Sequence, residues 1–170
     1  GFDGNRVVTM QVTLAGQAYQ TPASAVDYFT RLVTRVRAEP GVEDASLISG
    51  LFLSTTPNST NFNIEGRPVF TPAESVEVPV DTAAPGYFAT MRVPLLRGRE
   101  FTDGDTAEST RVVVINDTMA RMFWPGEDPI GRRITYGVPD GDNTQWRTIV
   151  GVVADTRRTG YEAPVRPETY

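Results

Sequence analysis

The chain has 170 residues and a formal net charge of −5, from 21 acidic and 16 basic side chains. This length is enough to bury a real core, and the acidic balance argues against general affinity for nucleic acids or anionic membranes. Every basic residue is an arginine, and the sequence contains no lysine, histidine or cysteine. Composition therefore excludes lysine Schiff bases, histidine acid–base chemistry, thiolate nucleophiles and ordinary zinc sites. We expect a protein that is not an enzyme and has no metal or cofactor.

No stretch of the sequence approaches the roughly 20 apolar residues that are needed to cross a bilayer. The first residues, GFDGNRVV, lack the basic start and the apolar core of a signal peptide. The chain begins in an apparent strand and ends abruptly in PETY. We therefore expect it to be a segment of a longer protein, with membrane segments outside it.

The first 50 residues predict a strand, a helix and a second strand. Residues 6–14 alternate apolar and polar side chains, as in a strand with one buried face. Thr21 and Pro22 are typical of a helix start, because the hydroxyl caps the first turn and proline fits the first helical position. Residues 42–49 are predicted as the second strand, parallel to the first in a β-α-β unit. The helix has an apolar face at Val26, Phe29, Leu32 or Val33, and Val36.

The loop at residues 50–59 contains an apolar triplet, Leu51, Phe52 and Leu53, followed by polar residues and proline. One interpretation is a buried anchor before an exposed linker. The other is a lip that contacts a cargo or a partner protein, because functional contacts concentrate in loops. Both remain open from the sequence.

The middle of the chain predicts two strands and a short helix. Residues 62–65 and 74–82 are the strands, and Pro79 places the second at a sheet edge or a bulge, because proline donates no N–H. Residues 85–91 predict the helix, and the Arg97-Gly98-Arg99 sequence predicts a turn.

Residues 101–110 carry three acidic side chains, Asp103, Asp105 and Glu108. A calcium loop is a poor fit, because its glycine and its terminal glutamate do not fall in register, so a capped turn is favoured. Further on, the polar loop at 140–143 predicts a hairpin between strands at 134–138 and 145–154. Strict alternation would place Trp146, Thr148, Val150 and Val152 on one face of the second strand, with Arg147, Ile149, Gly151 and Val153 on the other.

The stretch from Arg111 to Ile134, RVVVINDTMARMFWPGEDPIGRRI, organises the prediction. Its β-branched run at 112–115 predicts a strand that is buried on both faces. Asn116 is the predicted cap of a helix that ends at Trp124, before Pro125. Trp124 is interpreted as a core aromatic, with a partner contact as the alternative. The helix has a predicted apolar stripe at Met119, Met122 and Phe123, with Ala120 beside it.

Three blocks together carry a family resemblance: PGYFATMRVPLLRGREF, the RVVVIN–FWPGEDPIG stretch, and WRTIVGVVADTRRTGYEAPVRPETY. In this order they resemble the extracytoplasmic domain of MacB-like and FtsX-like ABC transporter permeases, and are most similar to the duplicated permeases frequent in acidobacteria. The resemblance implies an α+β fold with two lobes. Residues 1–50 would be a porter-like β-α-β segment, incomplete here, with an unpaired strand edge and an uncovered helix face. Residues 51–170 would be a strand-rich, sabre-like lobe with two short helices, returning toward the porter-like lobe near its end.

The resemblance also implies a location on the periplasmic face of the inner membrane and a function. ATP hydrolysis by a cytoplasmic domain would be coupled mechanically to export or to a periplasmic partner, such as an adaptor protein. The partners would be the transmembrane and ATP-binding parts of the transporter, and the candidate contact residues are Leu51, Phe52, Leu53 and Trp124. Two alternatives stay open. One is a stand-alone sensory or binding domain that captures a peptide on a strand edge, and the other an enzyme that uses carboxylate pairs such as Asp103 with Glu108 or Asp155 with Glu162.

Overall fold

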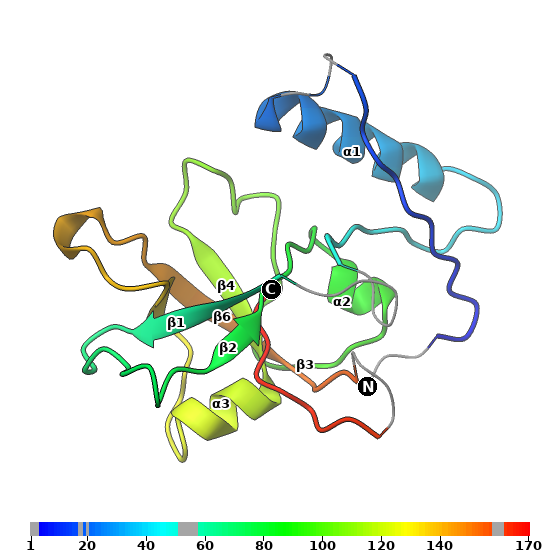
Figure 1. Cartoon of the computed structure of the whole chain (residues 1–170). Coiled ribbons are helices and arrows are strands. Elements are labelled where there is room, and N and C mark those ends of the chain that lie inside the picture. The colour runs from blue at the N-terminus through cyan, green and yellow to red at the C-terminus, as the bar shows by residue number, and fades with distance from the viewer. Residues whose placement is uncertain (1–3, 17–18, 20, 51–57, 158–161) are drawn as a thin grey trace.

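The computed structural model describes residues 4–16, 19, 21–50, 58–157 and 162–170. A mixed α+β fold is confirmed, with the helices set around one sheet (Figure 1). The helices are α1 (Pro22–Arg37), α2 (Tyr87–Thr90) and α3 (Asp117–Phe123), with a 3-10 turn at Gly141–Asn143. The strands are β1 (Ser59–Ile64), β2 (Glu77–Pro79), β3 (Leu95–Gly98), β4 (Val112–Asn116), β5 (Arg133–Tyr136) and β6 (Arg147–Val153).

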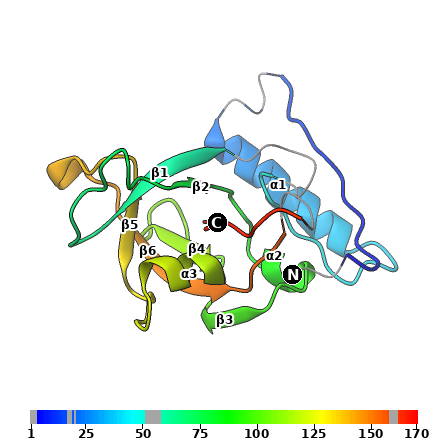
Figure 2. The ribbon, with the colours of Figure 1, turned by 60° about the horizontal axis from the view of Figure 1, so that its bottom comes forward.

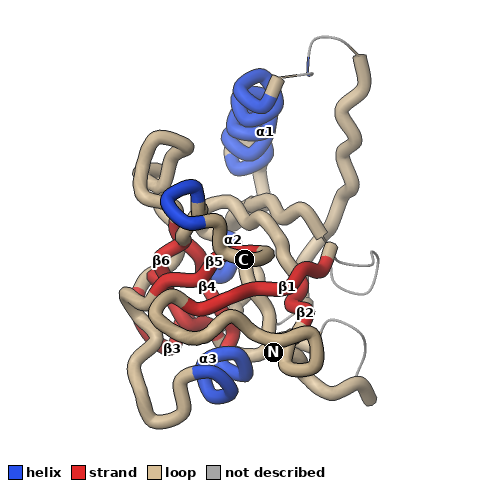
Figure 3. Tube along the Cα trace, turned by 60° about the vertical axis from the view of Figure 1, so that its left-hand side comes forward, coloured by secondary structure: helices blue, strands red, loops and turns tan. Residues whose placement is uncertain are grey.

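Helix α1 begins where the sequence predicts, because the Thr21 hydroxyl accepts the Ser24 N–H at 3.2 Å. It lies at the end of the molecule opposite α3, apart from the sheet (Figures 1 and 3). None of its residues is buried, and the Val26 side chain is 65% exposed. Phe29, Leu32, Val33 and Val36 are half-buried, so the apolar face of α1 is only partly covered within the described chain.

The two strands predicted beside α1 are wrong. Residues 7–15 run without strand structure, and Val8 and Met10 are 94% and 72% exposed. In the second stretch only Ile48 makes an isolated antiparallel bridge, to Ala83. Alternating apolar residues favour an extended chain, but a strand also needs a neighbour to bond with along its length. Among the described segments, residues 7–15 pair with no strand, and residues 47–49 pair only with the short stretch 82–84. The predicted β-α-β unit is thus reduced to its helix.

Strand β6 is the centre of the sheet. From Thr148 to Val153 it pairs in parallel with β4 on one side. On the other side it pairs antiparallel with β5 near its start and with β3 near its end. Beyond β5 come β1 and then β2, both antiparallel to their neighbours. The predicted hairpin around residues 140–143 is confirmed by the pairing of Arg133 with Thr148 and of Ile134 with Arg147.

The last residues of the chain close this sheet into a ring. The Tyr170 N–H donates to the Val114 carbonyl at 2.9 Å, and the Asn116 N–H donates to the Glu168 carbonyl at 3.2 Å. On its other side, the Thr169 N–H donates to the Pro79 carbonyl at 3.1 Å and its carbonyl accepts the N–H of Asp81 at 3.2 Å. Residues 166–170, which we name the closure segment, thus join β4 to the end of β2. Figure 2 shows the C-terminus among the strands.

The prediction that side chains of β6 alternate strictly between the two faces of the sheet is wrong beyond Ile149. The pairing of β6 with β4 shifts register at that point. Val113 pairs with Ile149, but Val114 pairs with Gly151, so Val150 is an extra residue. Such a bulge moves the following side chains to the opposite face. Ile149 and Val152 therefore share one core cluster, and Val150 and Val153 lie in the other.

The two clusters lie on opposite faces of β4, which confirms the prediction that this strand is buried on both faces. Val113 and Ile115 face the cluster beneath α3, and Val114 faces the cluster beneath α2. Met119, Ala120 and Phe123 of α3 are buried as predicted. Met122 is not part of the apolar stripe, since it is 54% exposed.

The Arg97-Gly98-Arg99 sequence continues a strand before the chain turns. Gly98 is the last residue of β3, with φ +72°. A Cβ at Gly98 would lie 2.1 Å from the Val150 carbonyl oxygen, so β3 approaches β6 this closely only with glycine. Pro79 ends β2, where its carbonyl accepts the bond from Thr169.

Candidate functional site

The densest group of polar contacts lies at the start of α3, and Asn116 is its buried centre. Its Oδ1 accepts the N–H groups of Met119 and Glu168, each at 3.0 Å. Its Nδ2 donates to the Arg166 carbonyl at 2.8 Å. The first bond confirms the predicted helix cap. The other two tie the helix start to the closure segment.

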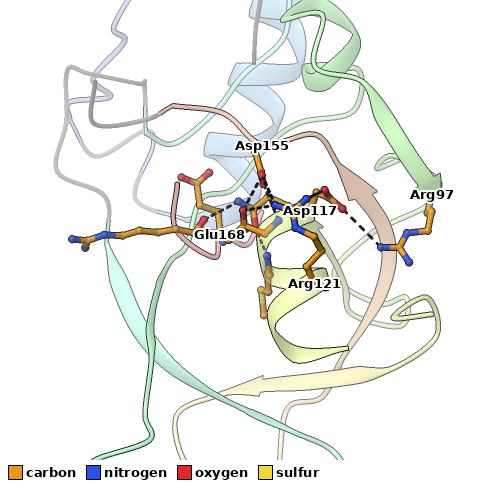
Figure 4. Close-up of polar contacts among 9 residues, drawn as sticks. Arg97, Asp117, Arg121, Asp155 and Glu168 are labelled. Atoms are coloured by element: carbon orange, nitrogen blue, oxygen red, sulfur yellow. Dashed lines mark hydrogen bonds and ion pairs between the residues drawn. The ribbon is translucent and has the colours of Figure 1, made fainter. Parts of the chain in front are cut away.

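Asp155 is a second cap of the same helix, contributed by the chain just after β6 (Figure 4). Its Oδ1 accepts the Thr118 N–H at 2.8 Å, and its Oδ2 accepts the Thr118 hydroxyl at 2.8 Å. The Arg121 guanidinium adds a contact to the same oxygen at 3.1 Å. A carboxylate at this end of a helix satisfies a free N–H and complements the positive helix dipole.

An outer layer of ion pairs extends the group toward β3. Asp117 pairs with Arg121 one turn along α3. The Arg97 side chain extends from β3 toward Asp117, with 4.0 Å between the charged atoms (Figure 4). The Arg121 and Arg97 side chains are 61% and 40% exposed, so solvent screens these pairs and each contributes little.

Glu168 lies on the inner side of the group, only 3% exposed. Its Oε2 accepts the Tyr170 hydroxyl at 2.8 Å and the Thr156 hydroxyl at 3.4 Å. Buried carboxylates are stable only with such partners. We name the whole group the polar joint: Arg97, Asn116, Asp117, Thr118, Arg121, Asp155, Thr156, Glu168 and Tyr170.

The joint connects segments that are distant in the sequence. It holds the start of α3, the end of β6, the closure segment and β3 together. The carboxylates of Asp155 and Glu168 accept hydrogen bonds from neighbouring groups of the same chain. Asp155, considered above with Glu162 as a carboxylate pair, is engaged with Thr118 and Arg121.

The acidic turn at 101–110 is a capped turn, as predicted. Asp105 accepts the Thr102 N–H at 2.8 Å and binds both terminal nitrogens of Arg99 at 2.7 Å. The hydrogen bonds from Arg99 are the main reason why the pKa of Asp105 falls to about 2. Among the described residues, no three or more acidic side chains form a cluster able to hold a metal ion.

An open hollow adjoins the joint on the α3 side. Its floor includes Trp124, which is 2% exposed and packs edge-on against Phe123. The core interpretation of Trp124 therefore holds for its ring, and a contact with a partner at the hollow stays a prediction. Leu51, Phe52 and Leu53 lie outside the described residues. The hollow is lined by Arg97, Ala120, Arg121, Trp124, Pro125, Gly126, Glu127 and Asp128.

Sequence reasoning missed the role of Asp155 and the three-way contact of Asn116. An aspartate two residues after a buried strand is a weak signal for a cap, since Thr118, whose N–H it accepts, lies 37 residues earlier in the sequence. The buried Glu168, within the terminal PETY, gave no signal at all.

Comparisons with known proteins define the family. The description "MacB-like periplasmic core domain" matches residues 2–165. The macrolide export ATP-binding/permease protein MacB of Aggregatibacter actinomycetemcomitans is 26% identical over 124 residues, which cover 71% of this chain and 18% of that protein. The chain thus spans less than a fifth of this curated relative.

One solved structure shares the fold. A domain assigned to a permease protein of Porphyromonas gingivalis has a TM-score of 0.53 at 20% identity, covering 81% of this chain and 54% of that one. The periplasmic region of MacB from Actinobacillus actinomycetemcomitans has a TM-score of 0.49 at 17% identity, covering 74% and 50%. Within the part of the chain that the structure describes, no helix is both long and apolar enough to span a bilayer. The match over residues 2–165 shows that the chain belongs to the family of MacB-like periplasmic core domains, the periplasmic parts of ABC transporter permeases.

Proposed function

We propose that this domain is a non-catalytic part of an ABC transporter permease, and that it transmits movement driven by cytoplasmic ATP hydrolysis to export or to a periplasmic partner. The observation that carries the proposal is the family match over residues 2–165. The curated relative is named as a protein with both ATP-binding and permease functions, and this chain spans 18% of it. The proposed partners are therefore the transmembrane and ATP-binding parts, with an adaptor protein as a further periplasmic partner.

The chemistry of the chain supports a mechanical role. The sequence has no histidine, lysine or cysteine to act as a base or a nucleophile. The carboxylates of Asp105, Asp155 and Glu168 are each held by groups of the same chain. A domain that acts through its shape needs internal contacts of this kind, because they let it move as a unit.

The alternative, capture of a peptide on a strand edge, has less support. Closure of the sheet gives β2 and β4 neighbours on both sides. Among the described strands, β3 is paired on one side, and it has only four residues. Peptide capture by strand addition uses a longer open edge.

The test is a distance measurement in the full-length transporter. A spin label at Met122→Cys uses an exposed side chain on α3, in a background cleared of other cysteines. A second label is placed at the periplasmic end of a transmembrane helix. We expect the distance between the labels to change between the nucleotide-free and the vanadate-trapped states. A label pair at Met122 and Val138 within the domain is the control and should not change.

Identical distances to the membrane label throughout ATP turnover would contradict the proposed function. The isolated 170-residue chain is expected to hydrolyse no ATP. Hydrolysis by the purified chain would instead show a catalytic activity that the proposal denies.

A further inference from the structure

Helix α1 is attached to the rest of the domain by the chain that follows it, which runs back toward α2 (cyan in Figure 1). Residues 47–49 of this chain are bonded to the stretch before α2. The Ser49 N–H donates to the Thr82 carbonyl at 2.9 Å, and the Ala84 N–H donates to the Leu47 carbonyl at 2.9 Å. Helix α1 itself has no extensive packing contact with a strand or another helix of the described chain. Its orientation therefore depends on the contacts near this connection.

Asp44 lies on this connection and joins the last residues of two helices. Its Oδ1 accepts the Nε–H of Arg37, the last residue of α1, at 2.9 Å. Its Oδ2 accepts the hydroxyl of Thr90, the last residue of α2, at 2.7 Å. One carboxylate thus contacts α1 with one oxygen and α2 with the other.

Further contacts restrict how the two side chains can turn. The Ala45 N–H donates to Asp44 Oδ1 at 2.8 Å, and Arg37 Nε also donates to the Ala45 carbonyl at 3.0 Å. The far end of the guanidinium reaches the start of α2, since Arg37 Nη2 lies 3.4 Å from the position that a Cβ at Gly86 would take. A planar guanidinium that is held at several points loses much of its rotational freedom.

Glu43 adds an outer pair of contacts at the same junction. Its Oε1 pairs with Arg6 of the N-terminal segment at 3.1 Å, and its Oε2 lies 4.0 Å from the guanidinium of Arg92, just after α2. The Glu43 side chain is 72% exposed, so solvent screens both ion pairs and they contribute little. The contacts of the neighbouring Asp44 are therefore the ones that set the geometry.

The charged form of Asp44 is the form that its contacts favour. Burial raises the pKa of the Asp44 carboxyl, but hydrogen bonds from Thr90 and Ala45 and the charge of Arg37 together hold the pKa below its usual value. The carboxylate is therefore ionised at neutral pH and accepts all of these bonds.

We propose that Asp44 is a clamp that fixes the angle between α1 and the sheet, because it holds Arg37 and Thr90 at the same time. The inference goes beyond the proposed function, since it concerns the isolated domain and requires neither ATP nor a partner. It gives α1, whose apolar face is only partly covered, a fixed orientation on the rest of the domain.

The test measures the distance between α1 and α3 in the 170-residue chain. Spin labels are placed at Thr30→Cys on α1 and Met122→Cys on α3, two exposed positions in a sequence without cysteine. For the otherwise unchanged chain we expect one narrow distance distribution. For Asp44→Ala we expect a distribution about twofold wider or more, because α1 then samples several orientations.

Thr90 offers a milder change with a matched control. Thr90→Val keeps the shape of the side chain and removes the hydroxyl that Asp44 accepts, so the distribution should widen, whereas Thr90→Ser keeps the hydroxyl and should leave it narrow. Asp27→Ala is the control for loss of an exposed ion pair, because Asp27 pairs with Arg31 within α1 at 2.7 Å. It should also leave the distribution narrow.

A second label pair, at Met122 and Val138, reports whether each variant keeps the fold of the sheet, and its distribution should stay narrow throughout. If Asp44→Ala widens this second distribution as well, the comparison of Thr90→Val with Thr90→Ser decides. The proposal is overturned if the α1–α3 distribution is already broad without the clamp substitutions, or if its width is unchanged in Thr90→Val. Equal widening in Asp27→Ala would also overturn it, because loss of any exposed ion pair would then suffice.

Discussion

Removal of the Asp155 carboxylate is predicted to destabilise the protein far more than removal of the neighbouring Asp117. In Asp155→Ala the Thr118 N–H loses its acceptor, and loss of such a cap costs about 1 kcal/mol. The Thr118 hydroxyl loses a bond to a charged oxygen, which adds about 1 kcal/mol, and the exposed Arg121 contact adds roughly 0.5 kcal/mol at most. We therefore expect a loss of about 2 to 3 kcal/mol in the free energy of unfolding, or roughly 5 to 10 °C in Tm.

Urea denaturation of the 170-residue chain measures this loss. Asp117→Ala is the matched control, because it removes a carboxylate that pairs with Arg121 at the surface, and it should cost less than about 1 kcal/mol. A double-mutant cycle of Asp155→Ala with Thr118→Val should show a coupling energy near 1 kcal/mol. If Asp155→Ala and Asp117→Ala unfold at the same urea concentration, the second cap does not stabilise α3 and the reasoning is refuted.

Three further predictions use the same denaturation assay. Gly98→Ala should cost more than about 3 kcal/mol because its Cβ would clash with the Val150 carbonyl, whereas Gly126→Ala, also at positive φ but with open space, should cost about 1 kcal/mol; equal costs would refute the clash. Asp105→Asn should cost about 1 kcal/mol at pH 6, since Arg99 is 45% exposed and screened. Because the folded pKa of Asp105 is lowered to about 2, this contribution is complete above the unfolded pKa of about 4 and disappears as the pH falls through about 2; a difference that persists there contradicts it. Leu32→Ala on the partly covered face of α1 should cost only about 1 kcal/mol because its side chain is half-buried, and a core-sized loss of about 3 kcal/mol would show that this face is fully covered.

The parts of the fold that local sequence determines were predicted well. Strand β4, the Asn116 cap and the end of α3 at Trp124 depend on residues within a few positions of one another. The same holds for the start of α1, where Thr21 caps a helix that follows directly. Signals of this kind act before any tertiary contact forms.

The parts that depend on distant partners were not predictable. Residues 6–14 have a strand pattern, but whether a strand forms depends on a neighbour elsewhere in the chain. Closure of the sheet joins Thr169 to Ile115 and to Val80, which are 54 and 89 positions away along the chain. The bulge at Val150 reflects the packing of β4 on β6, which alternation within one strand cannot reveal.

The candidate site divides in the same way. The sequence identified Asn116 as a helix cap, but the contacts of its amide with the closure segment depend on the folded ring. Asp155 and Glu168 belong to the site because the fold brings the chain after β6 and the closure segment beside the start of α3. Their neighbours in the sequence do not indicate these contacts. The location of the domain in a transporter came instead from the resemblance of three sequence blocks, which the family match confirmed.

Hydrogen exchange of individual backbone amides tests most directly whether the closure segment is an integral strand of the domain. The amides of Asn116, Thr169 and Tyr170 donate to backbone carbonyls across the closure. We predict that they exchange only through global unfolding, with the same free energy of opening as the amide of Ile149 in β6. Fast exchange of Thr169 and Tyr170, several kcal/mol below that of Ile149 and typical of a frayed terminus, would contradict the account.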